Sequence, residues 1–257
     1  MRRAAALFLA LALGPGVRAA DHLVKVDSRP GASISYWMME RPGARATLLL
    51  IPGGGGGIGL RGGVPRSQNF LVRSRDDFAA AGYNVALLGK PTDRPELDAQ
   101  YRAGDDHVAD IRAVVAKLSG DYGKPVWLVG TSLGTISAAA AAAGMDPSRL
   151  AGIVLTSSVT RTNASTMFSV PMLPLSDIRV PVLVMHHKRD QCPVCEPGWA
   201  WRIEKALSNA PVKKLLLVDG GGGATGPACE ALNYHGYIGM EAEAAKDITD
   251  WIANPSP

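Results

Sequence analysis

The chain has 257 residues, of which 47% are hydrophobic and 19% are charged. This apolar content is too high for an intrinsically disordered chain, and the sequence has no short repeat of the kind that builds collagen or coiled coils. The formal net charge of +4 would favour an anionic partner if it belonged to the folded protein, so its position along the chain matters.

The first residues are typical of an export signal. Arg2 and Arg3 form a positive region, and ten apolar residues follow before a Gly-Pro-Gly break. An apolar run of this length is shorter than the roughly 20 residues that cross a bilayer. We expect cleavage after Ala19, which makes residues 1–19 a signal peptide and residues 20–257 the mature chain. The protein is therefore predicted to be periplasmic or secreted, with no membrane attachment after cleavage.

Removal of the signal also removes most of the basic charge. Arg2, Arg3 and Arg18 leave with it, so the net charge falls from +4 to +1. A charge this small predicts neither a nucleic-acid partner nor an anionic membrane partner. The expected partner is a small molecule, and no feature of the sequence specifies an oligomeric state.

Along the mature chain, short apolar runs rich in β-branched residues alternate with longer amphipathic stretches. In chain order, the expected strands are residues 23–26, 33–38, 47–51, 84–88, 126–129, 153–156, 180–185 and 215–218. Helical spacing predicts helices over residues 70–81, 105–118, 137–143, 199–207 and 240–252. This alternation favours a mostly parallel sheet of about eight strands that helices cover on both faces. No linker divides the mature chain, so we predict a single α/β domain.

The segment Gly130-Thr131-Ser132-Leu133-Gly134 stands between a predicted strand and a predicted helix. It matches G-x-S-x-G in the strand, turn and helix context that a nucleophilic serine requires. The glycines relieve crowding in the tight turn, and the helix N-terminus presents free N–H groups and the positive end of its dipole. We therefore predict that Ser132 is a nucleophile, with a glycine-rich structural turn as the alternative.

At this motif the chain resembles the α/β-hydrolase superfamily, and the resemblance covers nearly all of the mature chain. It implies an α/β-hydrolase fold and a catalytic triad in the chain order serine, acid, histidine. The stretches 70–75, 130–138, 187–192 and 229–236 narrow the resemblance to exported bacterial α/β-hydrolases of undefined substrate.

The resemblance directs the search for the acid and the base to residues beyond Ser132. Asp190 follows a predicted strand and lies 58 residues after the serine, and His235 lies 45 residues further on, in a loop before the last helix. Both intervals fit one or two strand–helix units. Asp219 is the competing acid, but it ends the last predicted strand, where we expect it to support the loop. The predicted triad is Ser132, Asp190 and His235.

The other four histidines are expected to have structural roles. His22 lies at the mature terminus, and His107 precedes the serine, beside the apolar stripe of its helix, where it could also line a pocket. His186 and His187 end a strand before Asp190, which is too early for the base in this chain order.

Two backbone N–H groups are expected to form an oxyanion hole. In the superfamily, one belongs to the residue after the nucleophile, here Leu133. The other comes from the loop after the third strand, here the run from Pro52 to Gly57, where glycine lets the backbone approach a substrate. We predict Gly54 or Gly55 as this donor. No Gly-Lys-Ser/Thr follows the run, so a phosphate-binding loop is not expected.

Three cysteines, Cys192, Cys195 and Cys229, fit an oxidising compartment and allow at most one intramolecular bridge. We favour Cys192–Cys229 because it would hold the loops that carry Asp190 and His235 in register. The narrower resemblance implies the same pairing. A Cys195–Cys229 bridge and three free thiols are the alternatives.

The same region supports two other chemistries. Cys192 and Cys195 form a C-x-x-C motif of the kind found in redox proteins, and together with His186, His187 and Asp190 they could bind zinc. Neither chemistry accounts for the serine motif, so we predict no metal and no cofactor.

The segment between residues 156 and 180 shows no clear helical pattern, which predicts a minimal cap over an open site. Its apolar residues favour a small or medium acyl or aryl group in the substrate; they are Met167, Phe168, Val170, Met172 and Leu173. The sequence therefore predicts a serine hydrolase that cleaves carboxylic esters, with small amides as a subset, through an acyl-enzyme. An acyltransferase with the same triad is one alternative. A non-catalytic or redox protein that uses Cys192 and Cys195 on a hydrolase scaffold is the other.

Overall fold

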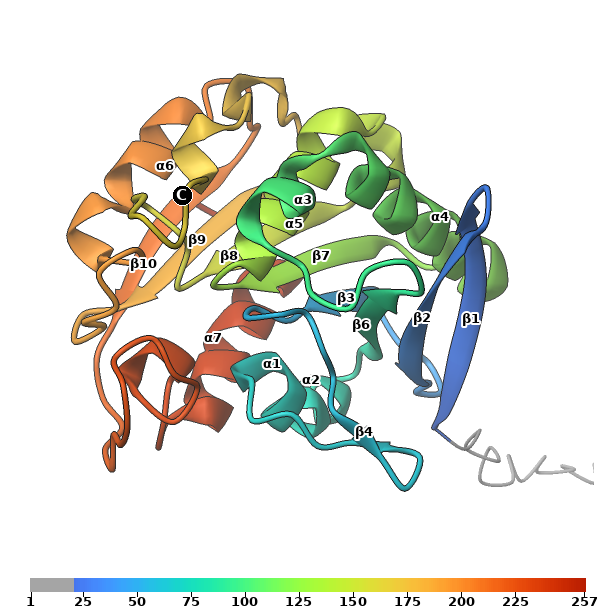
Figure 1. Ribbon diagram of the computed structural model, residues 1–257, viewed down its shortest axis with the longest axis horizontal. Coiled ribbons are helices and arrows are strands. Elements are labelled where there is room, and N and C mark those ends of the chain that lie inside the picture. Colours follow the sequence, from blue (N-terminus) through green and yellow to red (C-terminus); the bar gives the residue numbers. More distant parts are fainter. Residues whose placement is uncertain (1–20) are drawn as a thin grey trace, which may run out of the picture.

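The computed structural model describes residues 21–257, so the predicted export signal at residues 1–19 lies outside the described residues. Eight strands form one sheet in the order β1-β2-β6-β3-β7-β8-β9-β10 (Figure 1). Their bounds are β1 His22–Arg29, β2 Ala32–Met39, β3 Thr47–Ile51, β6 Asn84–Pro91, β7 Val126–Thr131, β8 Gly152–Thr156, β9 Val182–His187 and β10 Lys213–Val218. The pairs β1–β2 and β2–β6 are antiparallel, and all other neighbours are parallel. The prediction of a mostly parallel sheet of about eight strands is confirmed.

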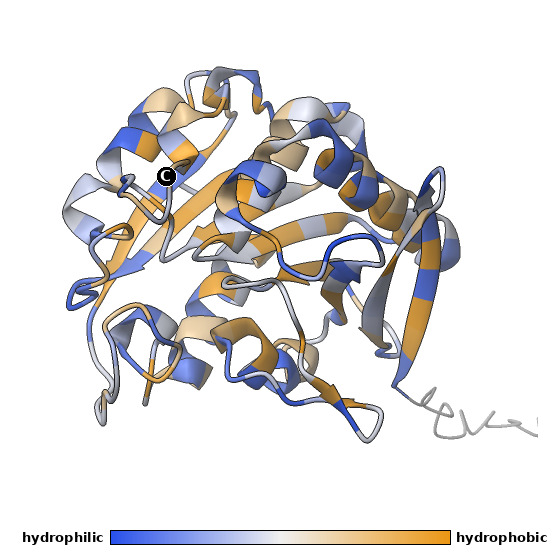
Figure 2. Cartoon of the chain, in the orientation of Figure 1, coloured by the Kyte–Doolittle hydropathy of each residue, from blue (hydrophilic) through white to orange (hydrophobic). Residues whose placement is uncertain are grey.

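Helices cover both faces of this sheet (Figure 1). One face carries α3 (Ala99–Ala103), α4 (Asp105–Tyr122), α5 (Gly134–Gly144) and α6 (Trp201–Ala206). The other carries α1 (Phe70–Arg73), α2 (Arg75–Ala80) and α7 (Glu241–Ala253). Each layer encloses its own apolar core, and hydrophobic residues fill the central strands while the outer sides of the helices are more polar (Figure 2).

The alanine-rich stretch of the sequence forms α5, the helix that follows the G-x-S-x-G segment. Ala138, Ala139 and Ala141 are completely buried. Their small side chains let the helix lie close to the sheet, where it contacts β7 and β8. This close packing fixes the N-terminal end of α5 relative to the sheet.

Several element boundaries differ from the predictions. The helix expected over residues 70–81 is interrupted at Ser74, where α1 ends and α2 begins. Strand β9 begins at Val182, after Pro181, whose nitrogen has no hydrogen to donate to a neighbouring strand. The expected helix over residues 199–207 is shorter, because a 3₁₀ turn over Pro197–Trp199 precedes α6. Helix α3 and a small hairpin of β4 (Leu60–Arg61) and β5 (Val64–Pro65) were not predicted.

Between β8 and β9 the chain forms only two 3₁₀ turns, at Val170–Met172 and Leu175–Asp177. This segment therefore contains no α-helical cap, in agreement with the expected minimal cap. Among residues 21–257, none of the helices combines the length and the apolar character needed to cross a membrane.

The parallel strands β3, β7, β8 and β9 all end at the same edge of the sheet. In open α/β sheets this carboxyl edge is where ligands bind. The glycine run follows β3 directly, Ser132 follows β7 directly, and Asp190 comes three residues after the end of β9.

Candidate active site

Ser132 lies in the sharp turn between β7 and α5. Its backbone is in the left-handed region, with φ of 53°, and its N–H donates to the carbonyl of Thr156 at 3.0 Å. The flanking glycines have no room for a side chain. A Cβ on Gly130 would lie 2.4 Å from the carbonyl oxygen of Gly134, and one on Gly134 would lie 2.1 Å from that of Ile51. This strained turn therefore requires glycine on both sides of the serine.

His235 and Asp190 form a buried pair. The His235 Nδ1 atom lies 2.9 Å from Asp190 Oδ2, and the two side chains are 5% and 0% exposed. Because an ionised carboxylate only accepts hydrogen bonds, Nδ1 carries the proton and Nε2 presents a lone pair. Within the described chain, Nε2 is buried and has no hydrogen-bond partner. The pair therefore offers a proton acceptor that is oriented by a carboxylate and otherwise unused.

The loop that carries His235 is held by residues far away in the sequence. The hydroxyl of Ser157 donates to the His235 carbonyl at 2.9 Å. Arg73 donates to the carbonyls of Ala231 and Gly236, each at 3.0 Å, and its guanidinium also pairs with Glu241. These contacts fix the backbone on both sides of the imidazole. The sequence did not indicate them, since the contacting residues are 78 or more positions apart.

Backbone strain gathers around the same site. In the described part of the chain, the non-glycine residues with positive φ are Ser132, Ser157 and Tyr237. Ser132 lies in the sharp turn between β7 and α5, which we call the elbow. Ser157 donates to the His235 carbonyl, and Tyr237 follows His235 by two positions. Tyr237 is buried and donates its hydroxyl to the carbonyl of Met185 in β9. Strained residues of this kind persist where the surrounding structure determines them strongly, as at active sites.

The remaining histidines are occupied elsewhere. His186 Nε2 accepts a hydrogen bond from the Ser158 N–H, and burial lowers the pKa of His186 to about 4. His187 contacts the Gly220 carbonyl and stacks on Tyr234. Burial also lowers the pKa of His107, to about 3.

The competing acid is separate from the histidine pair. Asp219 is 52% exposed in its side chain and forms an ion pair with Arg189 at 3.0 Å. Asp190 instead has its second oxygen fixed, since Oδ1 accepts the Cys192 N–H at 2.9 Å. The structure thus brings His235 to Asp190 and leaves Asp219 at the surface.

A disulfide joins Cys192 to Cys229, the pairing that the sequence analysis favoured. It links the segment directly after Asp190 to the segment that leads to His235. Cys195 is a free, buried thiol. The alternative Cys195–Cys229 bridge is therefore excluded in this structure.

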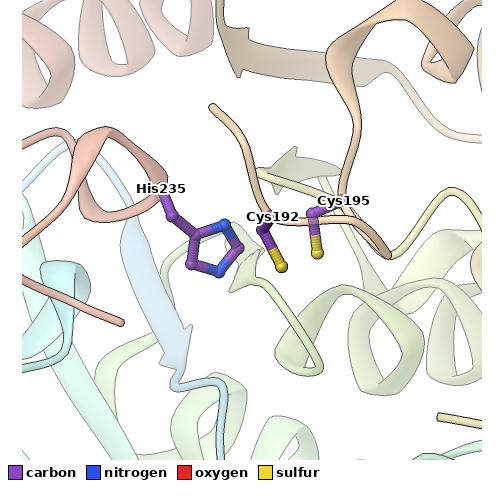
Figure 3. Close-up of side chains that lie close together, drawn as sticks. All are labelled: Cys192, Cys195 and His235. Atoms are coloured by element: carbon purple, nitrogen blue, oxygen red, sulfur yellow. The ribbon is translucent and has the colours of Figure 1, made fainter. Parts of the chain in front are cut away.

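Cys192, Cys195 and His235 lie close together, with their sulfur and nitrogen atoms within 4.8 Å of one another (Figure 3). Burial raises the pKa of the Cys195 thiol well above its usual value, and a hydrogen bond with the Ser132 side chain acts in the opposite direction. The trio does not fit a zinc site, since the Cys192 sulfur is in a disulfide and the His235 Nδ1 is bonded to Asp190.

Near Ser132, two groups of backbone N–H donors have no hydrogen-bond partner in the described chain. Within the described chain, neither the Leu133 N–H nor the N–H groups of Gly53, Gly54 and Gly55 make a hydrogen bond, whereas the Gly56 N–H donates to the Gly53 carbonyl. A Cβ on Gly53 would lie 2.7 Å from the Ser132 Cβ, so the glycine run passes directly against the elbow. This arrangement suits an oxyanion hole.

A cavity of about 470 Å³ opens above Ser132 and His235. Its buried lining is mostly apolar and includes Phe70, Val159 and Val194. Its exposed lining is mostly polar; it includes Gln68, Asn163, Ser165 and Glu230.

The apolar residues of the segment after β8 are expected to favour a small or medium acyl or aryl group, but in the structure they do not line the cavity; they are Met167, Phe168, Val170, Met172 and Leu173. Met167 and Met172 are exposed at the surface, whereas Val170 is completely buried in the core. The segment thus turns some apolar side chains into the core and others toward solvent, while the polar residues Asn163, Ser165 and Thr166 just before it line the cavity.

Comparison with models of known protein families and with curated proteins finds no match. Solved structures do match. An esterase from Pyrococcus furiosus is 13% identical, with a TM-score of 0.66 and coverage of 91% of both chains. A dienelactone hydrolase from Anabaena variabilis is 15% identical, with a TM-score of 0.63 and coverage of 91% of this chain and 97% of that one. An α/β serine hydrolase without lid from Xanthomonas campestris is 13% identical, with a TM-score of 0.54 and coverage of 93% and 94%.

These similarities, together with the sheet order and the elbow, show that the chain has the α/β-hydrolase fold. The expectation drawn from the G-x-S-x-G segment is confirmed at the level of the fold.

Proposed function

We propose that the protein is a serine hydrolase that cleaves carboxylic esters through an acyl-enzyme, with Ser132 as nucleophile, His235 as general base and Asp190 as the acid that orients it. The observation that carries the proposal is the buried His235 Nε2, which has no hydrogen-bond partner in the described chain and lines the same cavity as the strained Ser132. The structural neighbours named as esterases and serine hydrolases support the same chemistry.

In the proposed reaction, His235 Nε2 takes the hydroxyl proton of Ser132 while the serine oxygen attacks the acyl carbon. Asp190 stabilises the imidazolium through the Nδ1 hydrogen bond. The imidazolium then gives its proton to the leaving alcohol, and an acyl-enzyme remains. Water, deprotonated by His235, attacks the acyl carbon and releases the acid.

The oxyanion is proposed to be held by the Leu133 N–H and by the glycine run. Gly54 and Gly55 were the expected donors, and the close approach of Gly53 to Ser132 adds it to the candidates. Removing a single oxyanion donor costs about 10²–10³ in kcat in serine proteases, so this pair of donors is expected to supply a large part of the rate.

The proposed substrate has a small acyl group and a leaving alcohol that extends toward solvent. The buried apolar residues Phe70, Val159 and Val194 offer contacts to the acyl part. The exposed side of the cavity is mostly polar and is not covered by an α-helical cap, which leaves space for the alcohol. We further propose that the protein acts outside the cytoplasm, on the basis of the export signal predicted from the sequence and of the disulfide.

Turnover of short-chain aryl esters by the mature protein, with fluorophosphonate labelling alongside, tests the proposal. Wild-type protein should hydrolyse the ester and take up one label, and Ser132→Ala should lose both. Labelling without turnover would contradict ester hydrolysis while leaving a reactive serine, and product analysis with added alcohols would then reveal acyl transfer. A folded wild-type protein with neither labelling nor turnover would refute the serine hydrolase assignment.

A further inference from the structure

Beneath the glycine run lies a buried cation that no sequence motif indicated. Arg102, in α3, has no exposed surface. Its Nε donates to the Leu97 carbonyl at 3.1 Å and its Nη1 to the Ser137 hydroxyl at 2.9 Å. Its Nη2 donates to the carbonyls of Pro52 at 3.2 Å and Gly54 at 3.0 Å. A single guanidinium therefore holds two carbonyls of the glycine run.

This arginine has no carboxylate within ion-pair distance in the described part of the chain. Burial lowers the pKa of Arg102 to about 10, while the negative charges of Asp98 and Glu96 act in the opposite direction. The side chain therefore remains a cation at neutral pH. Keeping an unpaired charge in the interior is unfavourable, and the four hydrogen bonds to Leu97, Ser137, Pro52 and Gly54 offset part of this cost.

The direction of the two carbonyls determines the direction of the adjoining amides. The described chain has no cis peptide bonds, and in a trans peptide the N–H points opposite to the C=O. Because the Pro52 and Gly54 carbonyls point at Arg102, the N–H groups of Gly53 and Gly55 point away from it. Gly53 and Gly55 line the catalytic cavity, whereas Arg102 is buried and does not line it.

We propose that Arg102 is a positioning residue for the oxyanion hole: by binding the Pro52 and Gly54 carbonyls, it turns the Gly53 and Gly55 N–H groups toward Ser132 and adds a buried positive charge behind them. This inference rests on the proposed serine hydrolase function, because it assigns a device to the oxyanion hole of that same site. Donors fixed in advance are effective because no reorganisation is needed as the negative charge develops on the substrate oxygen.

The neighbours of Arg102 fit this role. Ser137 uses its hydroxyl oxygen to accept from Arg102, so its hydrogen is free to donate to His107 Nε2, which lies 2.9 Å away. That hydrogen bond places the His107 proton on Nδ1, which lies 4.0 Å from Asp110 Oδ2. Ser137 and His107 thus fix the guanidinium without neutralising it. His107, expected to be structural or to line a pocket, belongs to this buried cluster.

The test compares Arg102→Met and Arg102→Lys with a core variant, Val114→Ala. Methionine removes the charge and all the donors, while lysine keeps a charge but lacks the planar fork that spans several acceptors. Val114 is completely buried in α4 and does not line the cavity, so its truncation lowers stability without touching the glycine run. Folding is checked by circular dichroism and by the melting temperature.

With a short-chain aryl ester, we expect kcat to fall about 10- to 100-fold in Arg102→Met, with KM changed less than about threefold. The reason is that the substitution weakens stabilisation of the transition state rather than binding of the substrate. The kcat of Arg102→Lys should lie between that of Arg102→Met and that of the wild type. The inhibition constant of a trifluoromethyl ketone, which mimics the tetrahedral oxyanion, should rise by the same factor as kcat/KM falls. Val114→Ala should keep its kcat at temperatures below its melting transition.

Folded Arg102 variants with a wild-type kcat, or an equal loss of kcat in Val114→Ala at matched stability, would overturn the inference. If Arg102→Met does not fold, the lysine variant and its inhibition constant decide the question. A wild-type protein without turnover or labelling would remove the proposed function and this inference together. Turnover that depends on Ser132 but not on Arg102 would remove the inference alone.

Discussion

Removing the Cys192–Cys229 disulfide should lower stability much more than activity. The bridge closes a loop with a sequence separation of 37 residues. In the chain-entropy relation, a loop of about this length corresponds to about 4 kcal/mol of stabilisation through restriction of the unfolded chain. For a chain of this size, 1 kcal/mol shifts Tm by roughly 2–4 °C, so the double variant Cys192→Ala/Cys229→Ala should melt about 8–16 °C below the wild type.

The expected effect on catalysis is smaller because other contacts also hold the loop that carries His235. Arg73 holds the Ala231 and Gly236 carbonyls, and Ser157 holds the carbonyl of His235. These contacts remain in the double variant. We therefore expect kcat with an aryl ester at 25 °C to stay within about tenfold of the wild type, with activity lost at a lower temperature.

Thermal unfolding with and without reductant, followed by circular dichroism, measures the effect. Reductant should lower the wild-type Tm to that of the double variant and leave the double variant unchanged. Cys195→Ala is the matched control, since Cys195 is buried but takes no part in the bridge, and its Tm should still respond to reductant. A double variant that melts within about 2 °C of the wild type would refute the reasoning.

Three further predictions concern the site and its surroundings. Asp190→Asn should fold normally but lower kcat by about 10⁴, as in serine proteases, because the amide no longer fixes the imidazole tautomer; a loss below tenfold in ester hydrolysis would contradict the assigned role. Gly53→Ala should lower kcat by at least tenfold because its Cβ would lie 2.7 Å from that of Ser132, whereas Gly222→Ala, with no atom within 4 Å of its Cβ, should leave ester hydrolysis unchanged. Burial lowers the pKa of His107 to about 3 and that of His186 to about 4, so below pH 6.5 the unfolded chain binds protons that the folded chain does not. The free energy of unfolding in urea should therefore decrease as the pH falls from 6.5 to 4, by up to about 1.4 kcal/mol per pH unit for each histidine, and a constant value over this range would contradict it.

The parts of the site that could be predicted from sequence are those with a local signal. The serine turn is contained in five consecutive residues, and its glycines are required by contacts within the turn and with β3. Asp190 and Asp219 both follow a predicted strand between Ser132 and His235, so chain order alone does not separate them. The position of Asp219 at the end of the last strand, where it is expected to support the loop, favours Asp190. The disulfide pairing followed from the positions of two cysteines relative to the expected acid and base.

The parts that were missed depend on contacts between distant segments. Arg102, Arg73 and Ser157 act on carbonyl groups, and a carbonyl leaves no trace in the sequence because every residue has one. A buried arginine also looks like a surface arginine in a polar stretch such as residues 92–106. Only the folded chain shows which backbone groups such side chains reach.

The order of the strands has a consequence for the growing polypeptide. The serine turn belongs to β7 in the interior of the sheet, whereas Asp190 follows β9 and His235 follows β10. During synthesis Ser132, the proposed nucleophile, emerges 103 residues before the histidine that would activate it. A chain truncated anywhere before residue 235 therefore lacks the proposed base, however well its first strands fold. Turnover would then require synthesis to proceed past residue 235, so that shorter translation products remain inert toward esters around them.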